Sequence, residues 1–232
     1  LAELPGAQYL NFDVAAHRAV MLAQSWKHSA PLLVFDEIHK MRGWKSWLKG
    51  VFDGRTPGQQ ILVTGSARMD TFQQTGESLA GRFFRLRLHP LSVREWCDAT
   101  PTSPQAALTH LLERGGFPEP TLAATSTDAA RWRNEYFSGT VREDVLEFSR
   151  LQEVNAMRLF AEMLRSRVGS PLSIASMARD LNLSPVTLGK YLDILEALFI
   201  VFVVRPWHRN IARATLQSPK VYFYDTGLVL GD

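Results

Sequence analysis

Two short apolar runs, each followed at once by polar residues, constrain the fold of this chain more than any other feature. Residues 32–35 and 61–64 have the length of buried strands, and the stretch between them, residues 44–53, carries apolar side chains at helical spacing. Apolar strands separated by helices are typical of parallel sheets covered on both faces. The sequence therefore predicts an α/β fold, with a further strand at residues 9–12 and a helix at 14–27.

The composition is that of a folded globular protein and excludes several other classes. The 232 residues are 46% hydrophobic and 21% charged, which argues against a disordered, collagen-like or coiled-rod protein. No apolar run approaches the roughly 18 residues of a membrane span, and the first residues lack the pattern of a secretory signal. The single cysteine, Cys97, excludes an internal disulfide and a cysteine-cluster metal site. We therefore expect a cytoplasmic protein without a membrane partner.

Positive charge is in slight excess but is spread thinly along the chain. The net charge of +3 has no local concentration of the kind that marks an obligate nucleic-acid binder. One stretch differs, because no acidic residue occurs between Glu196 and Asp225. Its basic residues are the candidate nucleic-acid contacts: Arg205, Arg209, Arg213 and Lys220.

Two adjacent carboxylates, Asp36 and Glu37, follow the first apolar run. Parallel α/β sheets build their ligand sites at the carboxyl ends of their strands, so this position favours a functional role. In nucleotide hydrolases such an aspartate holds the water shell of magnesium, and the glutamate polarises the attacking water. The alternative is an acidic strand exit that is solvated or caps the next helix.

The second apolar run also ends in polar residues, among them Thr64 and Ser66. In the same architecture, a polar residue at the tip of the neighbouring strand senses the terminal phosphate. Thr64 and Ser66 are therefore candidate nucleotide contacts. The alternative is a simple strand-to-helix turn in which Ser66 caps the helix.

The pattern changes after an extended run at residues 83–88. Residues 97–104 form a polar linker, residues 105–150 are helical with a break at the Gly-Gly-Phe-Pro of 115–118, and a helix runs from residue 154 to near Gly169. The expected organisation is an α/β core at 1–98, a helical segment at 99–153 and a C-terminal domain at 154–232.

The C-terminal part has the spacing of a helix-turn-helix. Helices are expected at residues 174–181 and 185–198, with a turn at 182–184, and strands at 199–204 and 220–224 would complete a winged helix. The second helix would expose Thr187, Lys190 and Asp193, a poor set for reading DNA bases. Contact with DNA and contact with a protein partner both remain open.

Asp225-Thr226-Gly227, after the last strand, has no companion acidic motif of a nuclease nearby. We interpret it as a turn that closes on the domain surface.

Seven segments, in order along the chain, resemble a family of prokaryotic AAA-type predicted ATPases whose core is fused to a C-terminal domain of unknown function. They are YLNFD at Tyr9, LLVFDEIHK at Leu32, ILVTGSAR at Ile61, ESLAGRFFRLRLHPLSVREW at Glu77, GGFPEP at Gly115, VREDV at Val141 and KVYFYDTGL at Lys220. The resemblance spans nearly the whole chain. It implies ATP as ligand, magnesium as cofactor and ATP hydrolysis as activity, and it leaves a homo-oligomer open.

The resemblance also implies roles for single residues. Asp36 and Glu37 match the magnesium-binding and water-activating acids, and Ser66 matches the strand-tip sensor. Arg82 falls where the family keeps an arginine, which we interpret as a phosphate-contacting or finger-type residue. The alternative for Arg82 is an ion pair at the sheet edge with a carboxylate such as Glu77 or Glu95.

The chain departs from the family in one respect. The phosphate-binding loop, G-x-x-x-x-G-K-[ST], does not occur in the 232 residues, and Gly189-Lys190 is followed by Tyr191. Because residues 9–13 match the family's second strand, we expect the first strand and its loop to lie upstream of Leu1. We therefore expect these residues alone not to turn over ATP. The rival hypothesis is a nucleic-acid-binding or protein-binding module with a relic ATPase core.

Overall fold

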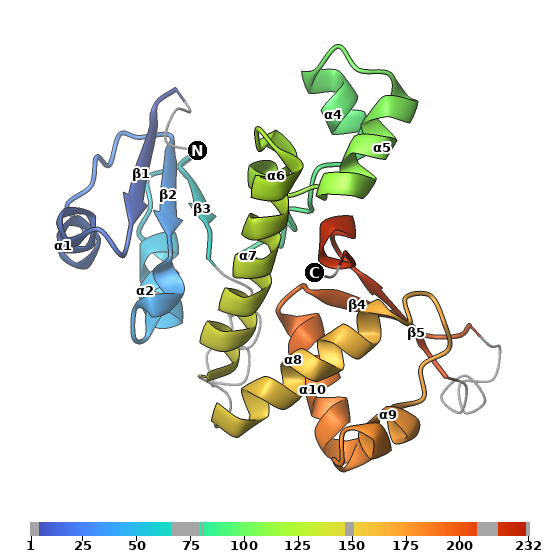
Figure 1. Cartoon of the computed structure of the whole chain (residues 1–232). Coiled ribbons are helices and arrows are strands. Elements are labelled where there is room, and N and C mark those ends of the chain that lie inside the picture. The colour runs from blue at the N-terminus through green and yellow to red at the C-terminus, as the bar shows by residue number, and fades with distance from the viewer. Residues whose placement is uncertain (1–4, 66–78, 80, 147–150, 208–217, 231–232) are drawn as a thin grey trace. The chain divides into compact units, whose positions relative to one another are not determined.

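The computed structural model describes residues 5–65, 79, 81–146, 151–207 and 218–230. The chain divides into two compact units, residues 1–86 and 87–232 (Figure 1). The helices expected as a separate segment at 99–153 lie in the second unit, together with the C-terminal helices.

The first unit is built on a parallel three-stranded sheet, which confirms the α/β core. Its strands lie in the order β1 (Ala7–Asn11), β2 (Leu32–Asp36) and β3 (Gln60–Val63). The described helices of this unit are α1 (Ala15–Ala23) and α2 (Trp44–Asp53), labelled in Figure 1, and the short 3-10 helix η1 (Ile38–Lys40).

Burial of the central strand holds this unit together. Leu33 and Phe35, on one face of β2, are fully buried in a cluster that includes Met21 from α1 and Leu48 from α2. Val34, on the opposite face, is fully buried as well. All three strands run in parallel, so their carboxyl ends meet at one edge of the sheet, which we call the carboxyl edge.

The segment between the sheet and the second unit differs from the expectation in two ways. The extended run at residues 83–88 pairs with no strand among the described residues. Its side chains Phe84 and Leu88 are 97% and 99% exposed. The linker expected at 97–104 is shorter, because α4 (Val93–Ala99) extends into it and α5 begins at Pro104. Ser92 explains the helix, since it forms a capping box with Glu95.

As far as its residues are described, the second unit consists of helices and one small antiparallel sheet. After α4 its helices are α5 (Pro104–Arg114), α6 (Pro118–Leu122), α7 (Ser126–Leu146), α8 (Leu151–Arg165), α9 (Ile174–Asp180) and α10 (Pro185–Ala197). Strands β4 (Val201–Val204) and β5 (Lys220–Phe223) pair antiparallel, and the 3-10 helix η3 (Thr226–Leu228) follows. Ser173 and Ser184 cap α9 and α10. The two helices expected here and the antiparallel strand pair after them are present.

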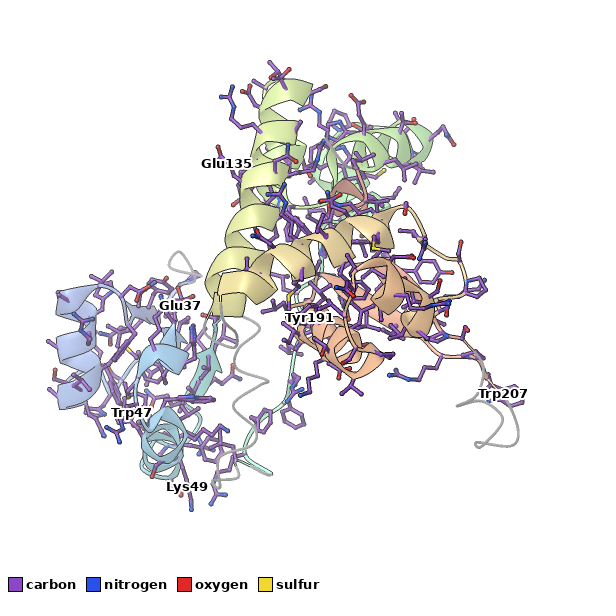
Figure 2. The ribbon with its side chains drawn as sticks, turned by 60° about the horizontal axis from the view of Figure 1, so that its bottom comes forward. Glu37, Trp47, Lys49, Glu135, Tyr191 and Trp207 are labelled. Carbon is purple, nitrogen blue, oxygen red and sulfur yellow. The ribbon has the colours of Figure 1, made fainter. Side chains whose placement is uncertain are left out.

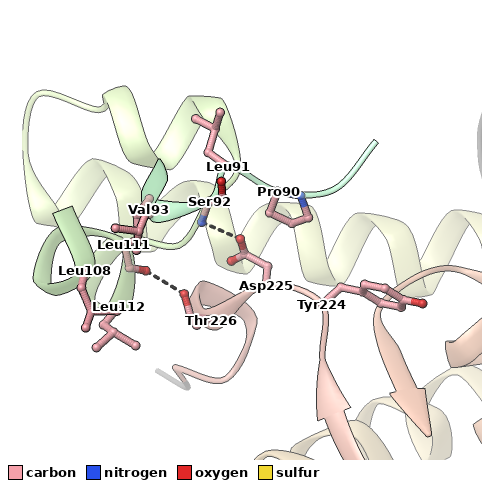
Figure 3. Close-up of a pocket in the computed structure, with 11 residues that line it drawn as sticks. Pro90, Leu91, Ser92, Val93, Leu108, Leu111, Leu112, Tyr224, Asp225 and Thr226 are labelled. Atoms are coloured by element: carbon pink, nitrogen blue, oxygen red, sulfur yellow. Dashed lines mark hydrogen bonds between the residues drawn. The ribbon is translucent and has the colours of Figure 1, made fainter. Parts of the chain in front are cut away.

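Asp225 joins two segments of the second unit that lie far apart in the sequence. Its carboxylate accepts hydrogen bonds from the backbone N–H of Gly116 at 2.5 Å and of Gly227 at 2.7 Å. Asp225 is buried, with 1% of its surface exposed. The Thr226 hydroxyl donates to the Leu111 carbonyl at 2.7 Å, beside a hollow of about 210 Å³ (Figure 3). A turn is therefore present, but its aspartate is buried rather than on the surface.

The same junction explains the glycine pair that breaks the helices. A Cβ on Gly115 would lie 2.4 Å from an Asp225 carboxylate oxygen, and one on Gly116 would lie 2.7 Å from the Leu91 carbonyl. Gly115 also has φ 90°, which other residues rarely adopt. Only glycine lets the backbone come this close to Asp225.

Asp225→Ala should destabilise the second unit, because it leaves two buried N–H groups without their acceptor. We expect the free energy of unfolding, measured by urea denaturation with circular dichroism, to fall by roughly 2–5 kcal/mol. Asp98→Ala is the control, because Asp98 is exposed in α4 and its ion pair among the described residues, with Arg94 at 3.8 Å, is exposed as well. Equal losses in the two variants would contradict the proposed role of Asp225.

The stability contributed by Asp225 should also depend on pH. Burial raises the pKa of Asp225 above the ordinary value of 3.8, although the N–H donors of Gly116 and Gly227 oppose this. Asp225 therefore binds its proton more tightly in the folded state than in the unfolded state. Its contribution to the free energy of unfolding is complete below pH 3.8 and is lost as pH rises through the pKa of the folded state. The free energy of unfolding of the parent, relative to that of Asp225→Asn, should fall over this range, whereas a constant difference would refute the assignment.

Candidate functional site

Asp36 is the centre of a hydrogen-bond network at the carboxyl edge of the first unit. Its Oδ1 accepts from the Thr64 hydroxyl at 2.5 Å and from the Glu37 backbone N–H at 3.1 Å. Its Oδ2 accepts from the Asn11 amide at 3.0 Å and from the Tyr9 hydroxyl. The sheet thus brings together the ends of all three strands around one carboxylate.

The network holds Asp36 in its ionised form. Burial by itself raises the pKa of Asp36, but the hydrogen bonds from Thr64, Tyr9, Glu37 and Asn11 outweigh burial and lower it. The same hydrogen bond raises the pKa of the Tyr9 phenol, because the phenolate could no longer donate to Asp36. At neutral pH the edge therefore presents a negative carboxylate beside neutral hydroxyl and amide donors.

Glu37 lies directly beyond the strand, in a tight turn that leads into η1 (Figure 2). Its φ of 56° is in the left-handed region, which is uncommon for a residue with a side chain. The other described non-glycine residues with positive φ each follow the end of a helix, whereas Glu37 follows a strand. Glu37 Oε2 lies 3.1 Å from the Lys40 ammonium and 3.7 Å from His39 Nε2. Lys40 is shared, because its ammonium also lies 2.5 Å from the Asp13 carboxylate.

Asp13 and Glu37 together hold Lys40 in its charged form. The hydrogen bond to Asp13 is the main reason that the pKa of Lys40 is raised. Because the Lys40 side chain is 43% exposed, these ion pairs add little to stability. Their effect is to fix where the Glu37 carboxylate lies.

The structure describes one of the two residues expected at the tip of β3. Thr64, directly after β3, lies against Asp36, so the structure brings the two together. Ser66 lies outside the described residues.

Arg82 has a different partner from the residues of this network. Its Nε contacts the Asp53 carboxylate at 3.2 Å. Asp53 is the last residue of α2, so the described ion pair joins Arg82 to that helix and not to Asp36. The expected alternative, a structural ion pair, is therefore present with Asp53, whereas Glu95 is engaged with Ser92 and Glu77 lies outside the described residues.

Four residues of this edge were not predicted from the sequence to have a role there: Tyr9, Asn11, Asp13 and Lys40. The available signal was alternation, because residues 9 and 11 lie on one face of a strand. The parallel register then places Asn11 beside Asp36. Which strand would lie next to β2 could not be known from spacing alone.

The candidate nucleic-acid contacts are only partly described. Arg205 directly follows β4, Lys220 is the first residue of β5, and both are exposed, whereas Arg209 and Arg213 lie outside the described residues. On α10, Lys190 and Asp193 are exposed as expected, while Thr187 is half-buried and its N–H donates to the capping Ser184.

The edge fits magnesium held through water. Magnesium prefers oxygen ligands and keeps several waters, so one ionised carboxylate beside a hydroxyl is sufficient from the protein. Within the described residues, no group of three or more histidine, cysteine or acidic side chains is placed to hold a metal ion. A search of the same residues for a helix long and apolar enough to cross a membrane found none.

Comparisons with known proteins agree with the two-unit division. A family model described as "AAA domain" matches residues 3–97, and a model described as "Domain of unknown function (DUF8612)" matches residues 105–230, more than half of the chain. No solved structure matches the chain significantly.

The curated relatives are themselves uncharacterized proteins. One from Mycobacterium tuberculosis is 31% identical over 198 residues, which are 85% of this chain and 43% of the relative. One from Methanocaldococcus jannaschii is 23% identical, over 83% of this chain and 46% of the relative, and one from Haemophilus influenzae is 22% identical, over 95% and 59%. The chain thus spans about half the length of the curated relatives it matches.

The order of the two matches confirms the resemblance found in the sequence. The chain belongs to the family in which an AAA domain is followed by the domain of unknown function DUF8612.

Proposed function

We propose that the first unit is the metal-binding and water-activating part of an ATPase that binds ATP with magnesium and hydrolyses it. One observation carries the proposal: an ionised Asp36, held by four donors and followed by Glu37, lies at the carboxyl edge of a parallel sheet. Ligands of such sheets bind at this edge. The AAA domain match at residues 3–97 supports nucleotide binding in the whole protein.

Each residue of the edge has a separate task in this proposal. Asp36 holds the water shell of magnesium, and Glu37 polarises the water that attacks the terminal phosphate. Magnesium, held there through its water shell, would supply positive charge that offsets the charge of the phosphates. Thr64 and Ser66 contact the terminal phosphate, and the phosphate loop is supplied from outside these 232 residues.

Arg82 has a conditional task. Arg82 is paired with Asp53, so it can contact a phosphate in its own chain only after it leaves the Asp53 carboxylate. The alternative is that Arg82 contacts a phosphate bound in the site of a second copy of the chain. A guanidinium suits the task because it stays charged and forks onto phosphate oxygens. The oligomeric state and the cytoplasmic location expected from the sequence stay predictions.

In the full-length protein, Glu37→Gln should keep ATP affinity within a few-fold of the parent and lower turnover at least about 100-fold, because Glu37 acts only on the water. Asp36→Ala should weaken magnesium-dependent ATP binding at least about tenfold, because Asp36 positions the metal. Phosphate release measures turnover, and titration with a fluorescent ATP analogue measures affinity.

Glu135→Gln is the matched control, because Glu135 is an exposed residue of α7 in the second unit (Figure 2). It should leave both quantities unchanged. Turnover of Glu37→Gln within a few-fold of the parent would show that the assigned roles are wrong.

We further propose that α8 to β5 form a winged helix that binds a partner. The order of α9, turn, α10 and an antiparallel strand pair supports it. The exposed face of α10 offers one cation, Lys190, with Asp193 one turn further on. That pair favours a protein partner over specific DNA reading, so any DNA contact falls to the basic stretch with Arg205, Arg209, Arg213 and Lys220.

DNA binding by this chain should accordingly be weak and insensitive to sequence. Four cations at most neutralise phosphates, so the logarithm of affinity should fall with the logarithm of salt concentration by a slope no steeper than about −4. Replacement of Arg205, Arg209 and Arg213 by alanine should reduce the slope to about −1 in a fluorescence anisotropy titration. Tight, sequence-selective binding that survives this replacement would instead place recognition on α10.

A further inference from the structure

The Asp36 carboxylate has two sides with different partners. We propose that its Oδ2 side is a permanent anchor on β1, and that on its Oδ1 side the Thr64 hydroxyl competes with magnesium-bound water. The inference rests on the proposed function, because it concerns how the same carboxylate takes up the metal. Tyr9 and Asn11 are then positioning residues, and Thr64 is released when the metal binds.

The competition follows from the number of hydrogen bonds. An ionised carboxylate offers about four acceptor sites on its two oxygens. Tyr9, Asn11, Thr64 and the Glu37 backbone supply four donors, two on each oxygen. A water of the magnesium shell can therefore donate to Asp36 only after one of these donors leaves.

The donors on Oδ2 are tied to each other as well as to Asp36. The Asn11 amide donates to the Tyr9 hydroxyl at 3.3 Å, and the Asn11 Oδ1 accepts from the Asp13 backbone N–H at 2.8 Å. The register of β1 and β2 places Asn11 beside Asp36. Displacing either donor on this side would therefore break several hydrogen bonds together.

On Oδ1, only Thr64 can leave without moving the backbone. The other donor, the Glu37 N–H, belongs to the residue next to Asp36 and is fixed by the turn in which Lys40 N–H donates to the Glu37 carbonyl at 3.1 Å. The Thr64 backbone N–H remains bonded to the Phe35 carbonyl at 2.9 Å while its hydroxyl rotates. The donor that yields to the metal-bound water is thus the Thr64 hydroxyl.

This arrangement links metal binding to the strand tip. When the Thr64 hydroxyl leaves Asp36, it becomes available to donate to another acceptor, and a phosphate oxygen is the acceptor that the proposed function supplies. Substitutions on the two sides should therefore change magnesium affinity in opposite directions, which a general loosening of the site would not do.

The test uses the full-length protein and a fluorescent ADP analogue at fixed concentration, titrated with magnesium chloride, because ADP lacks the terminal phosphate that Thr64 would contact in the proposed function. Thr64→Val removes the competing hydroxyl and should lower the magnesium midpoint by about 3–10-fold, even where turnover falls. Tyr9→Phe removes an anchor and should raise the midpoint by about 3–10-fold. Asn11→Ala tests the same anchor if Tyr9→Phe does not fold.

Tyr222→Phe is the matched control, because it removes a phenolic hydroxyl from β5 in the second unit, and its midpoint should stay within about twofold of the parent. The inference would be overturned by an unchanged or higher magnesium midpoint in Thr64→Val. A lower magnesium midpoint in Tyr9→Phe or Asn11→Ala would also overturn it. If Asp36→Ala still abolishes magnesium dependence, the proposed function stands without it. If the parent binds the analogue equally well in EDTA, the proposed function and the inference both fall.

Discussion

Hydrogen bonds to a single carboxylate join the carboxyl ends of all three strands in the first unit. Asp36 ends β2, Tyr9 and Asn11 reach it from β1, and Thr64 reaches it from the end of β3. Because the strands are parallel and their central member is buried on both faces, they must end at the same edge, and a charge there is partly desolvated. The four donors offset that cost and keep the carboxylate ionised at the place where a cation can use it.

Glu37 is held by a different kind of interaction. Its partner Lys40 is shared with Asp13, and all three side chains are partly exposed, at 28%, 43% and 52% respectively. Exposed ion pairs contribute little to folding stability, so their importance lies in orientation. The first unit thus combines a carboxylate held by four hydrogen bonds with a neighbouring carboxylate that is oriented by partly exposed ion pairs.

The second unit also depends on one carboxylate, Asp225, but there the balance between burial and hydrogen bonding is opposite to that at Asp36. Asp225 accepts two short backbone hydrogen bonds, yet burial dominates and raises its pKa, whereas hydrogen bonding dominates at Asp36 and lowers the pKa. Asp225 ties the chain at Gly116 to the turn after β5, so its role is to close the helical region onto the strand pair. Similar residues at strand ends therefore serve structure in one unit and a candidate site in the other.

The sequence by itself determined the local features: the apolar strands, α2 with the predicted bounds, the helices α9 and α10, and the acidic pair at a strand end. These depend on neighbours within a few positions, where side-chain pattern and capping chemistry act directly. The tertiary structure alone decided that Tyr9 and Asn11 hold Asp36, that Arg82 pairs with Asp53, and that Asp225 is buried against Gly116, 109 positions away. Such contacts depend on strand register and packing between distant segments, which local sequence patterns do not specify.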